Sequence, residues 1–85
     1  MYKVEISPSA EKQIKSLPKR EQTKIIKRAY KLVDDPRPPG VKKLKGVNSL
    51  YRIRQGDWRI VYTVEDKRLV VLVVKVGHRK EVYDI

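Results

Sequence analysis

Three arginines in the second half of the chain have the spacing needed to hold an anion. The pair Gly56-Asp57 predicts a two-residue hairpin turn, because glycine adopts positive φ at little cost. Such a turn places Arg54 opposite Arg59, with Arg52 on the same face, because side chains alternate along a strand. Like charges directly opposite each other destabilise a sheet. The pattern therefore predicts an anion between these arginines, and a guanidinium fork matches the oxygens of a phosphate.

The end of the chain adds groups suited to phosphate chemistry. We expect the last strand to pass the hairpin tip and leave the sheet at Gly77, which brings the following residues near the arginines. Attack of a 2′-hydroxyl on the neighbouring phosphate needs a base, an acid and positive charge. Arg79 adds positive charge, and His78, Glu81 and Tyr83 are candidates for the acid and base. Histidine has the most suitable unperturbed pKa, about 6.5, whereas tyrosine, at about 10, needs nearby arginines to lower it.

Further residues are candidates for binding RNA. Lys42, Lys43 and Lys45 are candidate phosphate contacts, which would make binding depend on salt without adding sequence specificity. Trp58, at the expected hairpin tip, either stacks on a base or packs in the core. We expect His78 to position or stack on RNA more than to catalyse.

The composition sets the class of protein. The 85 residues suffice for a single domain, 1–85, and the start of the chain has no apolar signal segment, so a cytoplasmic protein is expected. No apolar run is long enough to cross a membrane. The absence of cysteine and the single histidine argue against a metal site, and no cofactor is expected. A net charge of +11 predicts a polyanionic partner, of which nucleic acid is the commonest.

The elements follow the order β-α-α-β-β-β, which predicts an α+β fold. We expect a strand at 2–6, a helix capped by Ser7 and ended by Pro18, and a second helix at 19–33 whose buried stripe includes Tyr30. A loop at 34–40 then leads to three strands from Leu50 onward. The helical hairpin is expected to cover one face of a four-stranded, mainly antiparallel sheet, and the arginine face to stay open.

The pairing of the last strands is also predicted. A turn centred on Asp66-Lys67 would pair Val64 with Leu69 and Arg59 with Val74. The run 69–74 is apolar on both faces, which predicts an interior strand with the first strand beside it.

Three blocks of the sequence together resemble the RelE/ParE toxin superfamily, most closely its RelE branch. They are GVKKLKG at 40–46, YRIRQGDWRIVY at 51–62 and VGHRKEVY at 76–83. The resemblance implies a toxin of a type II toxin–antitoxin pair that binds the ribosomal A site and cuts the messenger RNA there. It also implies a cognate antitoxin as partner.

By position, the resemblance assigns the active site to Arg52, Arg54, Arg59 and Arg79, with Tyr83 as the tyrosine. The best-known RelE toxin has lysines where this chain has Arg52 and Arg54. Because arginine is effectively never deprotonated in a protein, these two positions would act through charge and not through proton transfer.

Other interpretations of the same residues remain. Arg52 and Arg54 are alternatively solvated strand charges, Arg59 and Arg79 alternatively pair with Asp57 or Glu81, and Tyr83 alternatively closes the core. A ParE-like toxin that inhibits DNA gyrase would share the fold and cut no RNA. A non-catalytic RNA-binding domain is a second alternative.

Overall fold

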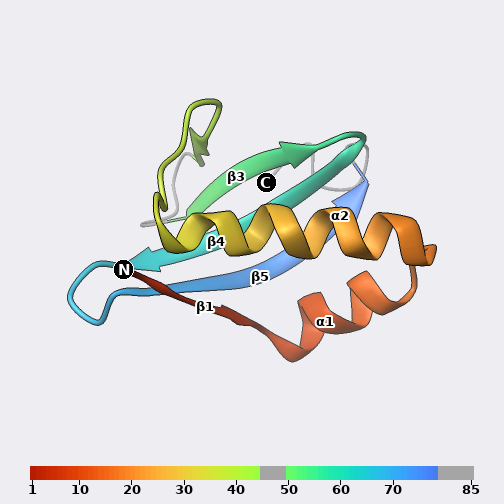
Figure 1. Ribbon diagram of the computed structural model, residues 1–85, viewed down its shortest axis with the longest axis horizontal. Helices are drawn as coiled ribbons and strands as arrows, with labels where there is room; N and C mark the ends of the chain where they lie inside the picture. Colours follow the sequence, from red (N-terminus) through yellow and green to blue (C-terminus); the bar gives the residue numbers. More distant parts are fainter. Residues whose placement is uncertain (45–49, 79–85) are drawn as a thin grey trace.

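Two helices pack on one face of a five-stranded sheet in the computed structural model, which describes residues 1–44 and 50–78 (Figure 1). In chain order the elements are β1 (Lys3–Ile6), α1 (Pro8–Lys15), α2 (Lys19–Tyr30), a 3₁₀ turn (Lys31–Val33), β2 (Lys42–Lys43), β3 (Leu50–Gln55), β4 (Trp58–Glu65) and β5 (Val70–His78). The α+β class and the helical hairpin on one face are confirmed. None of the helices in the described ranges is long and apolar enough to cross a membrane.

The sheet has the order β1-β5-β4-β3-β2, with β1 parallel to β5 and every other pair antiparallel. The interior position of β5 and the place of β1 beside it are confirmed. The prediction of four strands is wrong by one, because Lys42 and Lys43 pair with Arg52 and Tyr51 as a short edge strand.

Local sequence signals explain where the helices begin and end. The Ser7 hydroxyl accepts a hydrogen bond from the Ala10 amide at 3.1 Å, and Pro8 occupies the first turn, where its missing N–H costs nothing. The second helix stops at Tyr30, earlier than predicted, and its last residues tighten into the 3₁₀ turn. The following Pro36 cannot continue a helix and disfavours helical geometry in the residue before it.

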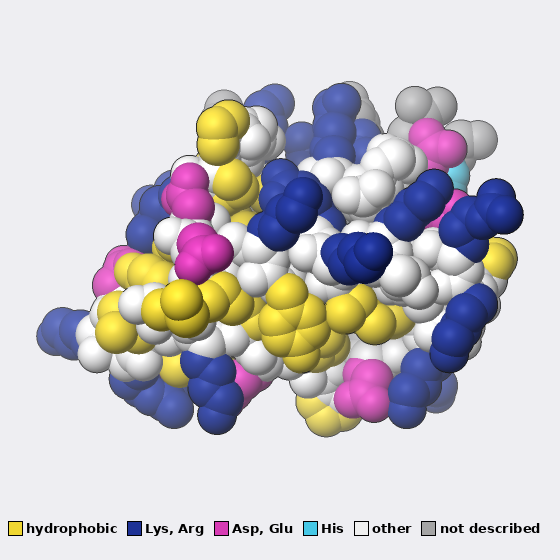
Figure 2. Space-filling view, viewed as in Figure 1, with side chains coloured by type: hydrophobic (Ala, Val, Ile, Leu, Met, Phe, Trp, Pro, Cys, Tyr) yellow, Lys and Arg dark blue, Asp and Glu magenta, His cyan; other side chains and the backbone are white. Residues whose placement is uncertain are grey.

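The core lies between the helices and the sheet. Ile53, Ile60 and Tyr62 are at most 1% exposed and face the helices, as predicted. From the helices, the buried residues are Ala10, Ile14, Ile25 and Ala29. The assignment of Tyr30 to packing is wrong, because this side chain is 50% exposed. Hydrophobic side chains are in fact visible as a band beside α2 on the surface (Figure 2).

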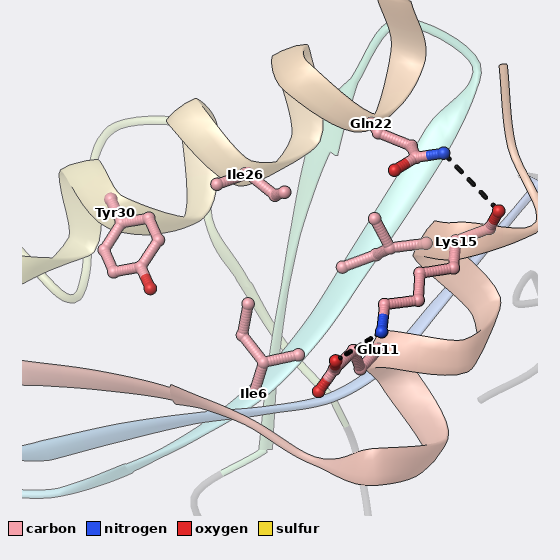
Figure 3. A pocket seen from close by; sticks show the side chains of 7 residues that line it. Ile6, Glu11, Lys15, Gln22, Ile26 and Tyr30 are labelled. Carbon is pink, nitrogen blue, oxygen red and sulfur yellow. Dashed lines mark hydrogen bonds and ion pairs between the residues drawn. The ribbon is translucent and has the colours of Figure 1, made fainter. Parts of the chain in front are cut away.

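An open groove of about 390 Å³ explains the exposure of Tyr30. Its lining includes Ile6, Ile26 and Tyr30, and Glu11 and Lys15 form an ion pair at 2.9 Å along its α1 side (Figure 3). The groove lies between α1, α2 and β1, on the face of the sheet that carries the helices. It is therefore separate from the arginine face.

The first hairpin has the predicted register. Gln55 pairs with Trp58, Arg54 with Arg59, and Ile53 with Ile60. Gly56 has φ +61°, and Asp57 has no positive φ, which is the pattern of a type II′ turn. The two-residue turn therefore fixes which side chains share each face.

The second hairpin differs from the prediction. Val64 pairs with Val71 and not with Leu69, and Arg59 pairs with Gly77 and not with Val74. The turn is longer than predicted because Leu69 takes a left-handed conformation, φ 54°, and its amide bonds to the Asp66 carbonyl at 3.3 Å. A bulge between Val61 and Tyr62 shifts the register again.

Candidate active site

The face of the sheet opposite the helices carries two rows of positive charge. Residues paired directly across strands share a face, so the strand pairings define both rows. One row runs from Lys42 through Arg52 and Val61 to Lys75, and the other contains Arg54, Arg59 and Gly77. The basic face consists of Lys42, Arg52, Arg54, Arg59 and Lys75.

Exposure differs across the basic face. Arg54 is exposed and Arg52 is half-buried, whereas Arg59 is only 8% exposed. Val61, which lies between Arg52 and Lys75, is also buried, with only 2% of its surface exposed. The prediction of an open face is therefore wrong at the centre of the sheet. Both buried residues lie on the interior strand β4, whereas Arg54 lies on β3, nearer the edge of the sheet.

The close approach of Arg54 and Arg59 has an electrostatic consequence. They are direct cross-strand neighbours, as predicted, and one of them is withdrawn from solvent. Repulsion between two guanidinium groups grows as water is excluded, because the effective dielectric constant falls. An anion bound at this point would be attracted to both groups at once. This is the arrangement that the predicted phosphate site requires, and binding of a phosphate by the pair stays a prediction.

Trp58 and His78 lie at the tip of the sheet but on its other face. The pairing places Gln55, Trp58 and His78 in one row, which alternates with the row of Arg54 and Arg59. The rings of Trp58 and His78 meet edge to face, with centroids 5.6 Å apart and planes at 84°. Trp58 is partly buried and packs against the core. Packing thus accounts for at least part of the role of Trp58.

The remaining predicted residues are placed as follows. Lys42 and Lys43 are exposed and lie on opposite faces of β2, so only Lys42 belongs to the basic face. Lys45, Arg79 and Tyr83 lie outside the described residues, so the roles given to them stay predictions.

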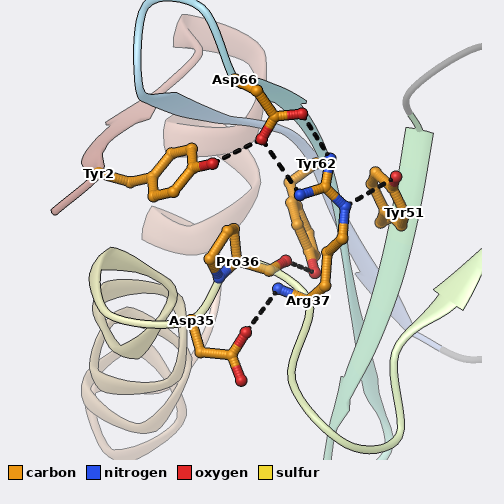
Figure 4. Close-up of polar contacts among 7 residues, drawn as sticks. All are labelled: Tyr2, Asp35, Pro36, Arg37, Tyr51, Tyr62 and Asp66. Atoms are coloured by element: carbon orange, nitrogen blue, oxygen red, sulfur yellow. Dashed lines mark hydrogen bonds and ion pairs between the residues drawn. The ribbon is translucent and has the colours of Figure 1, made fainter.

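A cluster around Arg37 joins the loop that precedes β2 to β3 and to the turn after β4 (Figure 4). The Arg37 guanidinium donates to both carboxylate oxygens of Asp66, at 3.1 and 2.8 Å, and its Nε donates to the Tyr51 hydroxyl at 3.0 Å. The Tyr2 hydroxyl also donates to Asp66, and the Tyr62 hydroxyl donates to the Pro36 carbonyl at 2.7 Å. These contacts fix the start of the loop that leads to β2. They therefore help to set Lys42 beside Arg52.

The cluster changes the pKa values of its members. The hydrogen bonds from Arg37, and next from Tyr2, lower the pKa of Asp66 from 3.8 to about 2. The bond to Asp66 raises the pKa of Arg37 above its ordinary value, and the same carboxylate raises the pKa of Tyr2. Burial raises the pKa of Tyr62. Asp66 and Arg37 therefore stay charged across the physiological range.

The Asp66→Asn variant is expected to change how stability depends on acid. The pKa of Asp66 is lower in the folded state than in the unfolded state. The contribution of this carboxylate to folding stability is therefore present above about pH 4 and is lost as the pH falls towards 2. The wild-type melting temperature should exceed that of the variant near neutrality, and the two should converge near pH 2. Thermal melts followed by circular dichroism across this range provide the measurement.

The matched control for this experiment is Asp57→Asn, which changes another exposed aspartate in a turn. This control should keep the acid dependence of the wild type. Since the Asp66 side chain is 56% exposed, added salt should also narrow the difference at neutral pH. Melting temperatures of wild type and Asp66→Asn that run parallel down to pH 2 would contradict the role given to this carboxylate.

Sequence reasoning missed two members of this region. Lys75 joins the basic face only because the bulge shifts the register, and its position in an apolar run gave no sign of it. Arg37 falls in the segment 34–40, which the sequence predicts as a connecting loop, and a charged residue between prolines is only a weak signal. In residues 1–44 and 50–78, no group of three or more histidine, cysteine, aspartate or glutamate side chains is arranged to hold a metal ion.

Comparisons with known proteins agree with this fold. The model of the ParE toxin family of type II toxin–antitoxin systems matches residues 4–83. The mRNA interferase toxin RelE of Escherichia coli K12 is 40% identical over 68 residues, covering 75% of this chain and 68% of that protein. Among solved structures, RelE in the archaeal RelE–RelB complex from Pyrococcus horikoshii has a TM-score of 0.80 and 34% identity, over 92% of this chain and 94% of that chain.

The intact RelBE toxin–antitoxin complex of E. coli also has a TM-score of 0.80, with 28% identity over 92% of this chain and 96% of that chain. The family model thus spans almost the whole sequence, and relatives and solved structures alike are RelE proteins. The chain therefore belongs to the RelE/ParE superfamily of type II toxins, and to its RelE-like branch.

Proposed function

We propose that this protein is the toxin of a type II toxin–antitoxin pair and a ribosome-dependent endoribonuclease. It acts in the cytoplasm, where it cuts messenger RNA in the ribosomal A site. The observation that carries the proposal is the cross-strand pair of Arg54 and Arg59, with Arg52 on the same face. Membership of the RelE-like branch supports it, since the E. coli relative is an mRNA interferase.

The proposed reaction is attack of a 2′-hydroxyl on the adjacent phosphate. A bond forms between the 2′-oxygen and phosphorus, the bond to the 5′-oxygen breaks, and negative charge builds up on the phosphate oxygens. Guanidinium groups that are already in position stabilise this charge. They supply the positive charge that a metal ion provides in other nucleases, so the proposal includes no metal or other cofactor.

The base that takes the 2′-hydroxyl proton must be a group other than Arg52 and Arg54, because arginine does not act as a base. The resemblance to RelE points to Tyr83 with Arg79, both beyond the described residues, and the chemistry of histidine keeps His78 as a candidate. Arg52 and Arg54 are assigned to binding the phosphate and stabilising its charge.

The proposed partners are the ribosome with its messenger RNA and a cognate antitoxin. Two of the solved relatives described above are RelE–RelB toxin–antitoxin complexes. A chain with net charge +11 is well matched to an acidic, partly disordered antitoxin segment, which folds as it covers the basic surface. Such a segment would keep the toxin from RNA.

The test uses purified protein, ribosomes and a defined messenger RNA, with new 5′ ends mapped by primer extension. We expect cuts at a fixed position within the codon held in the A site. A second message with one nucleotide inserted after the start codon provides the control. The cuts should move with the reading frame and should not stay with the nucleotide sequence.

Two other results would overturn the proposal. Intact message together with accumulation of cleaved gyrase–DNA complexes would identify a gyrase inhibitor. Intact message with salt-sensitive binding to ribosomes would identify a non-catalytic RNA-binding protein.

A further inference from the structure

The outer face of α2 carries a second concentration of positive charge. Lys24, Lys27, Arg28 and Lys31 form the α2 patch and, with Gln55 of β3, line a hollow of about 210 Å³. Three of these basic side chains are exposed and Arg28 is half-buried. Figure 2 shows lysine and arginine side chains spaced along this helix, on the side of the molecule that carries the helices.

The spacing within the patch is unfavourable for an isolated helix. Lys24 and Arg28, and likewise Lys27 and Lys31, are four residues apart, and like charges at this separation repel each other. Within the described residues none of the four takes part in an ion pair. The negative end of the helix dipole favours Lys27 and Arg28, which lie in the last turn, but it does not account for Lys24 a turn earlier.

The patch adjoins the basic face around an edge of the sheet. Gln55, at the end of β3, contributes to the hollow, and the preceding Arg54 belongs to the basic face. Strand β2 pairs only with Tyr51 and Arg52, so in the described structure it does not cover the end of β3. Positive charge thus continues from one face of the sheet, past this edge, to the helix.

The chemistry of the patch indicates which kind of nucleic acid it suits. Among the described residues that line it there is no aromatic side chain, whereas surfaces that bind single strands combine positive charge with aromatic rings that stack on bases. A row of cations without stacking groups recognises backbone and shape, as is typical of binding to helical RNA. Lys24 and Lys31 are about 10 Å apart along the helix axis, enough to contact more than one phosphate.

We propose that the α2 patch binds the phosphate backbone of a folded RNA, separately from the messenger strand on the basic face. This proposal rests on the proposed function only in taking RNA as the partner. In that setting the folded RNA is the ribosomal RNA that lines the site where the message is held. The patch then contributes to docking, while the basic face contributes to cleavage.

The experiment compares two variants that each lose four positive charges. The patch variant carries Lys24→Gln, Lys27→Gln, Arg28→Gln and Lys31→Gln, and the control carries Lys3→Gln, Lys12→Gln, Lys67→Gln and Arg68→Gln. Glutamine forms helices well, and circular dichroism confirms that each variant is folded. The probes are a 2′-O-methyl RNA hairpin, which cannot be cut by 2′-hydroxyl attack, and a 2′-O-methyl single strand of equal length.

Binding is measured over a range of salt concentrations. For the hairpin, the patch variant should bind at least tenfold more weakly at low salt, and its plot of log affinity against log salt should be shallower by about 2 to 3. The control should lose much less affinity for the hairpin. For the single strand, the two variants should lose similar affinity. A third variant keeps the charge of the patch by carrying Lys24→Arg, Lys27→Arg and Lys31→Arg with Arg28 unchanged. It should bind the hairpin as the wild type does.

Equal losses in the two variants would show that only net charge matters, and would overturn the proposal. An oligoglutamate peptide serves as the third probe. A loss confined to this peptide would assign the patch to an acidic protein partner and would also overturn it. A wild type that binds the hairpin through the patch but leaves messages intact would refute the proposed nuclease alone. A wild type that cuts messages, with a patch variant that binds the hairpin normally, would refute the patch alone.

Discussion

Replacing Arg54 with alanine is expected to slow cleavage of messenger RNA about 100-fold or more, which is the usual cost of losing one preorganised group that stabilises transition-state charge. The same change should leave the protein as stable as before, or slightly more so. The reason is that Arg54 is exposed and lies directly opposite Arg59, so its removal relieves repulsion between like charges. Activity and stability should therefore move in different directions.

The matched control for Arg54 is Arg68→Ala, which removes an exposed arginine from the turn between β4 and β5. Cleavage rates on ribosomes and urea unfolding curves are measured for both variants. The control should cleave at close to the wild-type rate, because Arg68 does not belong to the basic face. It should also be about as stable as the wild type, because its ion pair with Glu65 lies on the surface and contributes little to stability. If Arg54→Ala cleaves as fast as the control, Arg54 has no part in the reaction.

Replacing Ile60 with alanine is expected to lower the free energy of unfolding by about 2–5 kcal/mol, the range for deleting a buried aliphatic side chain. Ile60 is fully buried on interior strand β4, between Ile53 and Val76 on the neighbouring strands. The cavity would lie directly behind the basic face, since Arg59 is the adjacent residue. Urea unfolding followed by Trp58 fluorescence measures the loss.

A series at position 60 separates cavity size from other effects. Ile60→Val removes a single methyl group and should cost about 0.5–1.5 kcal/mol. Because valine suits a strand as well as isoleucine does, the loss between wild type and Ile60→Val reports packing alone. A loss below about 1 kcal/mol for alanine would mean that the core does not depend on this position as the structure implies.

Local signals in the sequence were sufficient to predict much of the fold. Gly56-Asp57 fixed the register of β3 against β4, because a two-residue turn leaves no freedom in the pairing. Ser7 and Pro8 marked the start of α1 in the same way. The second hairpin could not be predicted, because its turn depends on Leu69 in the left-handed conformation. This conformation is rare for leucine, and no pattern in the sequence indicates it.

For the candidate site as well, residues positioned by local turns could be predicted, and residues positioned by a bulge or by tertiary contacts could not. Arg52, Arg54 and Arg59 were placed together correctly, since they belong to the hairpin whose turn was recognised. Lys75 was missed because a bulge moved it into the row of Arg52. Arg37 was missed because its partner, Asp66, lies far along the chain, and only tertiary structure brings the two together.

The most direct test of the central claim asks whether Arg54 contacts the phosphate at the cleavage site. Two messages carry a 2′-deoxy nucleotide there, so that neither can be cut. One keeps the charged phosphate at this linkage, and the other has an uncharged methylphosphonate in its place. Binding of wild type and Arg54→Ala to ribosomes is compared on both messages. If the basic face holds this phosphate, Arg54→Ala should weaken binding about tenfold on the charged linkage and have almost no effect on the neutral one. The same loss on both messages would contradict the account.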